Sequence, residues 1–401
     1  MTSLAYAALW VFTFAIPWEN IIVIPGIGTI SRLLGMVAVG FAVMAAVMSG
    51  RLRRPQPFHV AAVLFVICAG FGVFRTADEG RAIGKFGTYL QLLLVLWMVW
   101  ELAPTFRKQR GLLLAYVFGA YVAAVNTVLV YRSSLGTPNR RFAAQGFDPN
   151  DLGMTLALAL PMAWYLGMTH RQPLLRWACR AYLPLGLVAI GLTGSRGALV
   201  ASIVALVIVP VSMTQLSPGR MAAGVFLLFA SGAAAVTFIP ASSWERYSAT
   251  RAEAAAGVGN LNSRLVVWKM GLRAFSEKPI LGYGTSGFNW AVRSQSHNSY
   301  LSVLVEQGIV GFVLYAMMFI TVFIRVMRMP TMERRFALVL LATLAVAMLP
   351  LVWDDRKPVW LILALLTAIA AALPVGTARV PPLPQRLPRR PMPIARQRAA
   401  S

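Results

Sequence analysis

The sequence predicts an all-α integral membrane protein, and its composition and its apolar runs carry that prediction. Of the 401 residues, 58% are hydrophobic and only 12% are charged, and the mean hydropathy is +0.68. This is far more apolar than an average soluble domain. Apolar runs of roughly 20 residues, the length that a helix needs to cross a bilayer core, recur between short polar breaks. The chain must therefore be solvated mostly by lipid, as helices that pair their own backbone groups.

The apolar runs indicate about twelve transmembrane helices. They are expected near residues 2–17, 32–49, 58–74, 83–103, 111–131, 151–169, 181–194, 197–214, 221–240, 299–324, 336–352 and 358–375. Residues 1–376 are thereby predicted to form one polytopic membrane domain. The first run has no basic segment before it and no Ala-x-Ala cleavage site, so we expect a retained helix rather than a signal peptide.

The distribution of basic residues predicts the orientation of the chain. If the N-terminus is cytoplasmic, the cytoplasmic loops and the C-terminal tail hold 20 of the 37 Lys and Arg residues. They hold only Glu101 and Glu333 among the 13 acidic residues. This bias follows the positive-inside rule and places both termini in the cytoplasm. The net charge of +24 is thus explained by the topology of the chain. We therefore do not take this charge as a sign of nucleic acid binding.

The tail, residues 377–401, is rich in proline and arginine and has few apolar residues. Such a segment cannot pack a core or continue a helix, so we expect a disordered cytoplasmic tail. Its basic residues are expected to anchor the topology, with binding to anionic headgroups as the alternative.

One connection on the expected outer face, residues 241–296, is far longer than the others and is predicted to carry function. Within it, NSRLVVWKMGLRAFSEKP is typical of an amphipathic helix that Asn262 or Ser263 caps. Its apolar stripe would consist of Leu265, Trp268, Leu272 and Phe275, and its cations are Arg264, Lys269 and Arg273. The glycines of the following ILGYGTSGF permit a tight turn or a close approach of the backbone to a ligand.

The long loop closes with SHNSYLSVLVEQGIVG, which contains His297. Ser296 or Asn298 can cap the next helix, which leaves His297 at the positive end of that helix, with Asn298 in a supporting role. The helix dipole disfavours an imidazolium there, and a neutral imidazole is what a general base requires. The alternative interpretation is a polar residue that faces water.

Arg196 lies in GLTGSRGAL, where two apolar runs meet. An ionisable residue at such a place is a functional candidate, because it is costly without a partner. A guanidinium beside Gly197 at the start of a helix suits a phosphate. The alternative is an arginine that only marks the membrane boundary. The other outer cations, Lys85 and Arg141 among them, add to a cationic surface.

The outer loops show no sequence pattern of a metal site. The pair Asp354 and Asp355 is followed by Arg356, and we expect these residues to pair locally. Cys68 and Cys179 fall in or beside different spans without a CxxC motif, so neither a metal site nor a disulfide is predicted.

Several motifs, taken together, resemble those of the O-antigen ligase and O-antigen polymerase superfamily of bacterial membrane glycosyltransferases. They occur in the family's order and cover about the middle third of the chain. They are GSRGA at 194–198, Arg264-x-x-x-Trp268, PILGYGTSGF at 279–288, HNSYLSVLVEQGIVG at 297–311 and, less specifically, DPNDLG at 148–153.

This resemblance implies a GT-C-like enzyme of the bacterial inner membrane with its active site facing the periplasm. The donor would be a glycan on undecaprenyl diphosphate, and the acceptor lipid A-core in the ligase branch or another lipid-linked repeat in the polymerase branch. The family's functional residues correspond to Arg196, Arg264 and His297, and Lys85 and Arg141 are further candidates for the diphosphate site.

The mechanism expected from the resemblance is an inverting displacement without metal or cofactor. The arginines would stabilise the leaving diphosphate, and His297 would deprotonate the acceptor hydroxyl. We favour the ligase branch. An O-antigen polymerase and a lipid or glycan transporter or flippase remain the alternatives. The transporter is disfavoured because the spans are largely free of charge and show no repeat.

Overall fold

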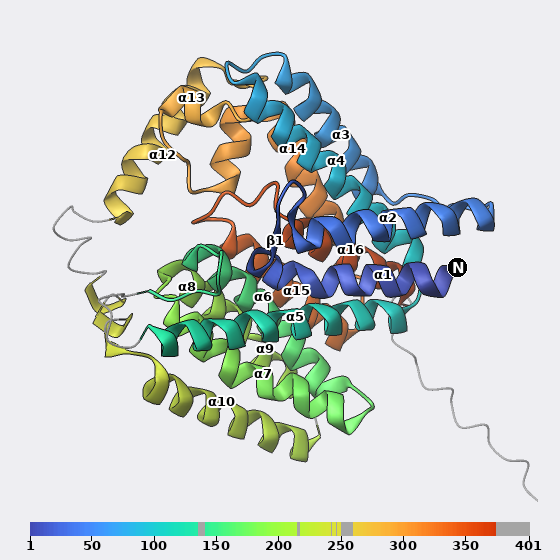
Figure 1. Cartoon of the computed structure of the whole chain (residues 1–401), viewed down its shortest axis with the longest axis vertical. Coiled ribbons are helices and arrows are strands. Elements are labelled where there is room, and N and C mark those ends of the chain that lie inside the picture. The colour runs from blue at the N-terminus through green and yellow to red at the C-terminus, as the bar shows by residue number, and fades with distance from the viewer. Residues whose placement is uncertain (135–140, 215–216, 242, 246, 250–259, 374–401) are drawn as a thin grey trace, which may run out of the picture.

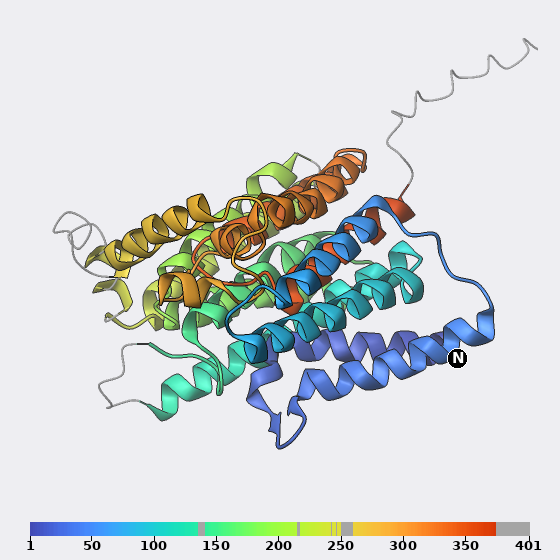
Figure 2. The same cartoon turned by 90° about the horizontal axis from the view of Figure 1, so that it is seen from above.

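The computed structural model describes residues 1–134, 141–214, 217–241, 243–245, 247–249 and 260–373. These residues are almost entirely helical, which confirms the predicted all-α membrane fold (Figures 1 and 2). Their strands are β1 (Val23–Ile24) and β2 (Gly28–Thr29), which form a short antiparallel hairpin after the 3₁₀ helix η1 (Ile16–Ile21). The predicted tail, 377–401, lies outside the described residues.

Each expected span corresponds to a helix in the structure. The helices are α1 (Thr2–Ala15), α2 (Ile30–Ser49), α3 (Pro57–Val73), α4 (Glu79–Leu102), α5 (Phe106–Ser133), α6 (Pro149–Thr169), α7 (Pro173–Leu192), α8 (Arg196–Leu206) with α9 (Ile208–Met213), α10 (Pro218–Phe238), α14 (Ser299–Val326), α15 (Thr331–Ala347) and α16 (Lys357–Ala372). Two further helices, α12 (Asn260–Glu277) and α13 (Phe288–Val292), lie between α10 and α14.

Within the described residues, eight helices, with α8 and α9 taken as one, are long and apolar enough to cross a membrane. The other four expected spans are helices of 14, 17, 17 and 16 residues, namely α1, α3, α15 and α16. These four are shorter than the roughly 20 residues that span a bilayer core. The multi-pass architecture is therefore clear, whereas the number of full spans stays a prediction.

Helix α6 forms the centre of the bundle. It packs against α5, α7, α8 and α15, and almost all of its residues are buried. Its sequence is apolar on every side, as expected for a helix surrounded by others. Asp148 caps its start by accepting hydrogen bonds from the backbone N–H groups of Asn150 (2.8 Å) and Asp151 (3.4 Å). The first turn of α6 is thus fixed at one end of the bundle, where the polar residues collect.

Helix α14 is broken at Gly308, whose φ of 63° and ψ of −166° are essentially restricted to glycine. The backbone groups that this break leaves unpaired bond to the segment 279–284. Tyr283 N donates to Val305 O (2.9 Å), Gly284 N to Glu306 O (2.8 Å) and Ile309 N to Pro279 O (2.8 Å). Gly282 of ILGYGTSGF therefore allows the close approach of this loop to the backbone of α14, and Gly284 allows its close approach to the end of α3.

We expect Gly308→Ala to destabilise the protein by at least about 2 kcal/mol, because the backbone conformation excludes a side chain. A Cβ on Gly308 would also overlap the carbonyl oxygen of Ile280. Thermal unfolding in detergent measures the loss. Gly40→Ala on α2 is the matched control, since a Cβ there meets nothing within 4 Å. Equal melting temperatures for the two variants would contradict the conclusion that the break in α14 requires glycine at position 308.

Helix α12 is amphipathic as predicted, but its buried face differs from the expected stripe. Trp268 and Phe275 pack against the cluster that contains Phe288 and Leu301, whereas Leu265 and Leu272 are 42% and 54% exposed. The face is rotated because Gly271 and Ala274 allow close contact with the start of α14. Helix α12 also begins at Asn260, so the expected caps Asn262 and Ser263 lie inside it.

Candidate active site

A polar cavity of about 450 Å³ lies at the end of the bundle where several helices begin. Its walls come from the N-terminal parts of α4, α6 and α14, the segment before α14 and the connection between α15 and α16. Among the lining residues, those with charged or titratable side chains are Lys85, Asp148, Asp151, His297, Glu306, Asp355 and Arg356. Helix N-termini carry partial positive charge, which offsets part of the negative charge of the four carboxylates in this lining.

His297 lies immediately before α14 and lines this cavity. Of the two expected caps, Asn298 is the N-cap, and its Oδ1 accepts from the backbone N–H of Leu301 (3.1 Å). The residues on either side of His297 are anchored to other elements. Trp268 Nε1 on α12 donates to Ser296 O (2.9 Å), and Ser299 Oγ donates to Leu351 O (2.7 Å). The imidazole is therefore positioned by the fold, and it makes no hydrogen bond within the described residues.

The electrostatic environment keeps His297 neutral. Burial lowers the pKa of the imidazole, the positive charge of Arg264 lowers it further, and Asp148 and Asp151 oppose both effects. The sequence predicted a neutral imidazole from the helix dipole, but burial is the main cause. A neutral imidazole near pH 7 can accept a proton.

Arg264 lies on α12 and is half-buried. Its charge acts on His297, and it interacts with the carboxylate of Asp148 at the start of α6. Burial lowers the pKa of Arg264, and Asp148 opposes that shift. Arg264, His297 and the start of α6 thus meet in one region, although they are far apart in the sequence.

Lys85 is held in a buried ion-pair network. Its Nζ lies 2.9 Å from Glu306 Oε2 on α14 and 2.9 Å from Asp354 Oδ2. The side chains of Lys85, Glu306 and Asp354 are 9%, 6% and 0% exposed. Tyr89 OH also donates to Asp354 Oδ2 (2.5 Å), and Ser286 N to Glu306 Oε2 (3.1 Å). Lys85 borders the cavity, but its charge is already balanced by two carboxylates.

The expectation that Asp354 and Arg356 form their ion pairs locally is wrong. Asp354 pairs with Lys85 on α4, and Arg356 Nη2 lies 3.8 Å from Asp151 Oδ2 on α6. Local spacing does not reveal these contacts, because the loop meets helices that are distant in the sequence. Burial and Asp354 raise the pKa of Asp355, while Lys85 and Arg356 oppose the shift.

Glu306 was missed by the sequence analysis, which took the spans to be largely free of charge. It lies on the broken helix α14 and is one of the two carboxylates that bind Lys85. An isolated acid in an apolar helix was the signal that could have identified it.

Arg196 and Arg141 are not among the described lining residues of the cavity. Arg196 is the first residue of α8 and is half-buried. Arg141 donates from Nε to Thr193 O (3.0 Å) and from Nη2 to Asn150 Oδ1 (2.7 Å). Asn150 lines the cavity, so Arg141 ties the α7–α8 turn to the cavity wall.

The described residues contain no group of three or more His, Cys, Asp or Glu side chains that could hold a metal ion. The two cysteines are free thiols, on α3 and α7.

Residues 181–316 match the family described as O-antigen ligase. The matched segment contains Arg196, Arg264 and His297, whereas Lys85 and Arg141 precede it. Comparison of the chain with curated proteins gave no match. The family match supports a function of the O-antigen ligase or polymerase type, and the apolar helices indicate a multi-pass membrane protein. The match therefore falls on the same part of the chain as the motifs GSRGA, Arg264-x-x-x-Trp268 and HNSYLSVLVEQGIVG, which resemble those of this superfamily.

Proposed function

We propose that the protein is an O-antigen ligase, which transfers glycan from undecaprenyl diphosphate to lipid A-core on the periplasmic face of the inner membrane. The observation that carries this proposal is the imidazole of His297, which lines a polar cavity and is kept neutral by burial and by the charge of Arg264. The family match supports the class of enzyme. The positive-inside bias of the loops supports the orientation.

In the proposed reaction, His297 takes the proton from an acceptor hydroxyl as the hydroxyl oxygen attacks the anomeric carbon of the donor. The bond between that carbon and the diphosphate oxygen breaks on the opposite face, so the configuration inverts. The bonding electrons leave with the diphosphate, whose growing negative charge is stabilised by Arg196 and Arg264. The starts of α6, α8 and α14 add partial positive charge at the same end of the bundle.

Lys85 and Arg141 take positioning roles in this proposal. The ion pairs of Lys85 connect α4, α14 and the α15–α16 connection around the cavity. Arg141 fixes the turn that precedes Arg196. In these roles, Lys85 and Arg141 hold the cavity walls in place without contacting the diphosphate.

The test is a transfer assay with purified protein in detergent, given the lipid-linked donor and lipid A-core. The expected product is glycan on lipid A-core, formed equally well in excess EDTA. A product in which glycan is joined to a second lipid-linked repeat would instead identify a polymerase, which uses the same donor. A requirement for added divalent metal would contradict the metal-independent mechanism.

A transporter or flippase is the second candidate, because α14 is broken and a charged network lies buried against it. Detergent solution has no separate compartments, so transport alone gives no transferred glycan. Absence of any transfer in the assay, combined with lipid-linked glycan movement in reconstituted vesicles, would favour this candidate.

Arg264→Lys is expected to lower kcat/KM for glycan transfer by about tenfold or more, because an ammonium keeps the charge but loses the planar two-pronged contact to phosphate. Steady-state kinetics with the lipid-linked donor measures the change. Arg273→Lys is the matched control, on the exposed face of the same helix. Wild-type kinetics in Arg264→Lys would show that Arg264 acts only as a point charge.

A further inference from the structure

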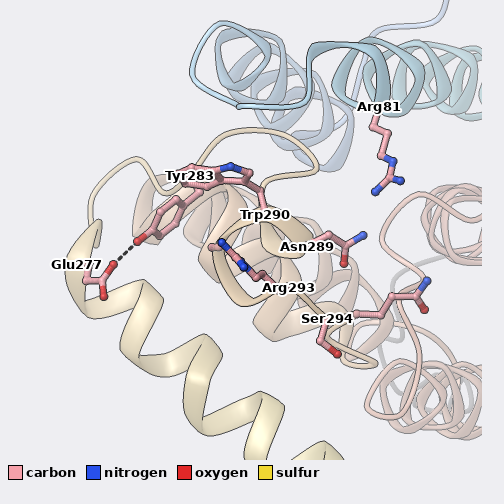
Figure 3. A pocket seen from close by; sticks show the side chains of 9 residues that line it. Arg81, Glu277, Tyr283, Asn289, Trp290, Arg293 and Ser294 are labelled. Carbon is pink, nitrogen blue, oxygen red and sulfur yellow. Dashed lines mark hydrogen bonds between the residues drawn. The ribbon is translucent and has the colours of Figure 1, made fainter.

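A second cavity, of about 690 Å³, adjoins the candidate active site. It lies between the start of α4, the end of α12 and the segment around α13 (Figure 3). Asn289 and Gln295 line both cavities, so the two lie next to each other on either side of these residues. The proposed mechanism assigns no role to this second cavity.

The lining of the second cavity combines cations, amides and an aromatic surface. Arg81 and Arg293 supply guanidinium groups, and Trp290 is 56% exposed. The Trp290 ring lies 5.8 Å from that of Tyr283, whose hydroxyl bonds to Glu277. Figure 3 shows Arg81 on α4 across the opening from Asn289 on α13 and from Ser294, which follows α13. Guanidinium groups bind phosphate and carboxylate, while an aromatic ring and amides suit the apolar faces and hydroxyls of a sugar.

Arg81 is available to an anionic ligand. It pairs with Asp78 at 3.2 Å, but its side chain is 68% exposed. An exposed ion pair of this kind contributes little stability, so exchanging it for a phosphate costs little.

The loop between the two cavities has an unusual backbone. In the described chain, the non-glycine residues with positive φ are Ser286 (61°), Arg293 (55°) and His297 (44°), and all belong to this loop. Ser286 and His297 line the first cavity and Arg293 the second. Such conformations persist where the surrounding structure enforces them, and they concentrate at binding sites. One strained segment thus connects the candidate base to the second cavity.

The position of the second cavity distinguishes the acceptor from the donor. Arg264 and Glu277 are 13 residues apart on α12, which corresponds to about 20 Å along a helix. Arg264 belongs to the donor diphosphate site of the proposed function, and Glu277 lines the second cavity. His297 is tied to α12 between them, through the bond from Trp268 to Ser296. The second cavity therefore lies on the other side of the base from the donor phosphates.

We propose that the second cavity binds an anionic sugar of the acceptor, one that carries phosphate or carboxylate beyond the hydroxyl that is attacked. This inference rests on the proposed function for the identity of the base and the donor site. Arg81 and Arg293 bind the anionic group, Trp290 packs against a sugar ring, and Asn289 and Gln295 guide the chain toward His297.

The test compares lipid A-core that retains its phosphates with the same acceptor after phosphatase treatment, using full-length protein in detergent. The variant is Arg81→Gln with Arg293→Asn, since asparagine tolerates positive φ. The acceptor KM is expected to rise about tenfold for the phosphorylated acceptor and less than twofold for the treated one. The donor KM and kcat are expected to stay unchanged. Lys269→Gln with Arg273→Gln, on exposed positions of α12 outside both cavities, removes the same charge and is expected to change nothing.

Trp290→Ala is expected to raise the KM for both acceptors, because packing against a ring does not depend on phosphate, and Trp290→Phe is expected to restore most of the affinity. Equal effects of the arginine variant on both acceptors would overturn the proposal. A rise in the donor KM alone would overturn it too, because the cavity would then hold the donor glycan. If the wild-type protein transfers no glycan, the proposed function fails. In that case, the affinities of the wild type and the variants for the two acceptors are measured without donor. These affinities still decide whether the cavity recognises an anionic sugar.

Discussion

His297→Asn is expected to lower kcat for glycan transfer by about 10²- to 10⁴-fold, the usual contribution of a general base. Asparagine removes the imidazole but tolerates the positive φ of this position, which is 44°. The hydrogen bonds around it, from Trp268 to Ser296 O and from Ser299 to Leu351 O, involve neighbouring residues and remain available. The variant should therefore insert and fold like the wild type. Transfer kinetics and thermal unfolding of the same purified sample separate the two properties.

The pH profile gives an independent check of the base. The neutral imidazole is the active form, and burial together with Arg264 lowers the pKa of His297 from its ordinary value of 6.5. Wild-type kcat/KM should thus be constant through neutral pH and fall only as the pH drops through that lowered pKa. This acidic limb should be absent from the residual activity of His297→Asn. Full activity of the variant, or an unchanged acidic limb, would refute the role of His297 as base.

Lys85→Met is expected to destabilise the protein by about 3–5 kcal/mol, because it leaves two buried carboxylates without their cation. Glu306 and Asp354 are 6% and 0% exposed and both lie within 2.9 Å of Lys85 Nζ. Melting in detergent, followed by fluorescence or by size exclusion, measures the loss. Lys269→Met, at an exposed position of α12, is the control.

A compensated variant shows whether unpaired charge is the cause. Lys85→Met combined with Glu306→Gln and Asp354→Asn removes both carboxylates, and we expect it to recover part of the lost stability. If Lys85→Met melts like the wild type and instead raises the donor KM, then Lys85 binds the diphosphate directly and the positioning role is wrong.

The sequence located the helices well because their signal is local. Helix α5, for example, was expected at 111–131 and occupies Phe106–Ser133. Lipid imposes apolar runs of sufficient length, and each run is visible without knowledge of its neighbours. The same holds for the start of α14, where Asn298 was one of two expected caps and proved to be the N-cap.

The face that a helix buries was harder to predict, as α12 shows. The periodicity of apolar residues indicated a stripe with Leu265 and Leu272, yet the packed face uses Gly271 and Ala274 beside Trp268 and Phe275. Small residues permit close approach of helices, but their contribution to packing depends on the residues of the neighbouring helix, which the sequence of α12 does not show.

The sequence by itself determined the membrane fold, the order of the helices, and the motifs around Arg196, Arg264 and His297, because composition, apolar length and motif spacing are local properties. Only the tertiary structure decided how charges are balanced around the cavity. Lys85 meets Glu306 across 221 residues, and Tyr89 meets Asp354 across 265. It likewise decided that the break at Gly308 is filled by the segment 279–284. Such pairings depend on which elements pack together at one end of the bundle, and a buried charge or an unpaired peptide group finds its partner only there.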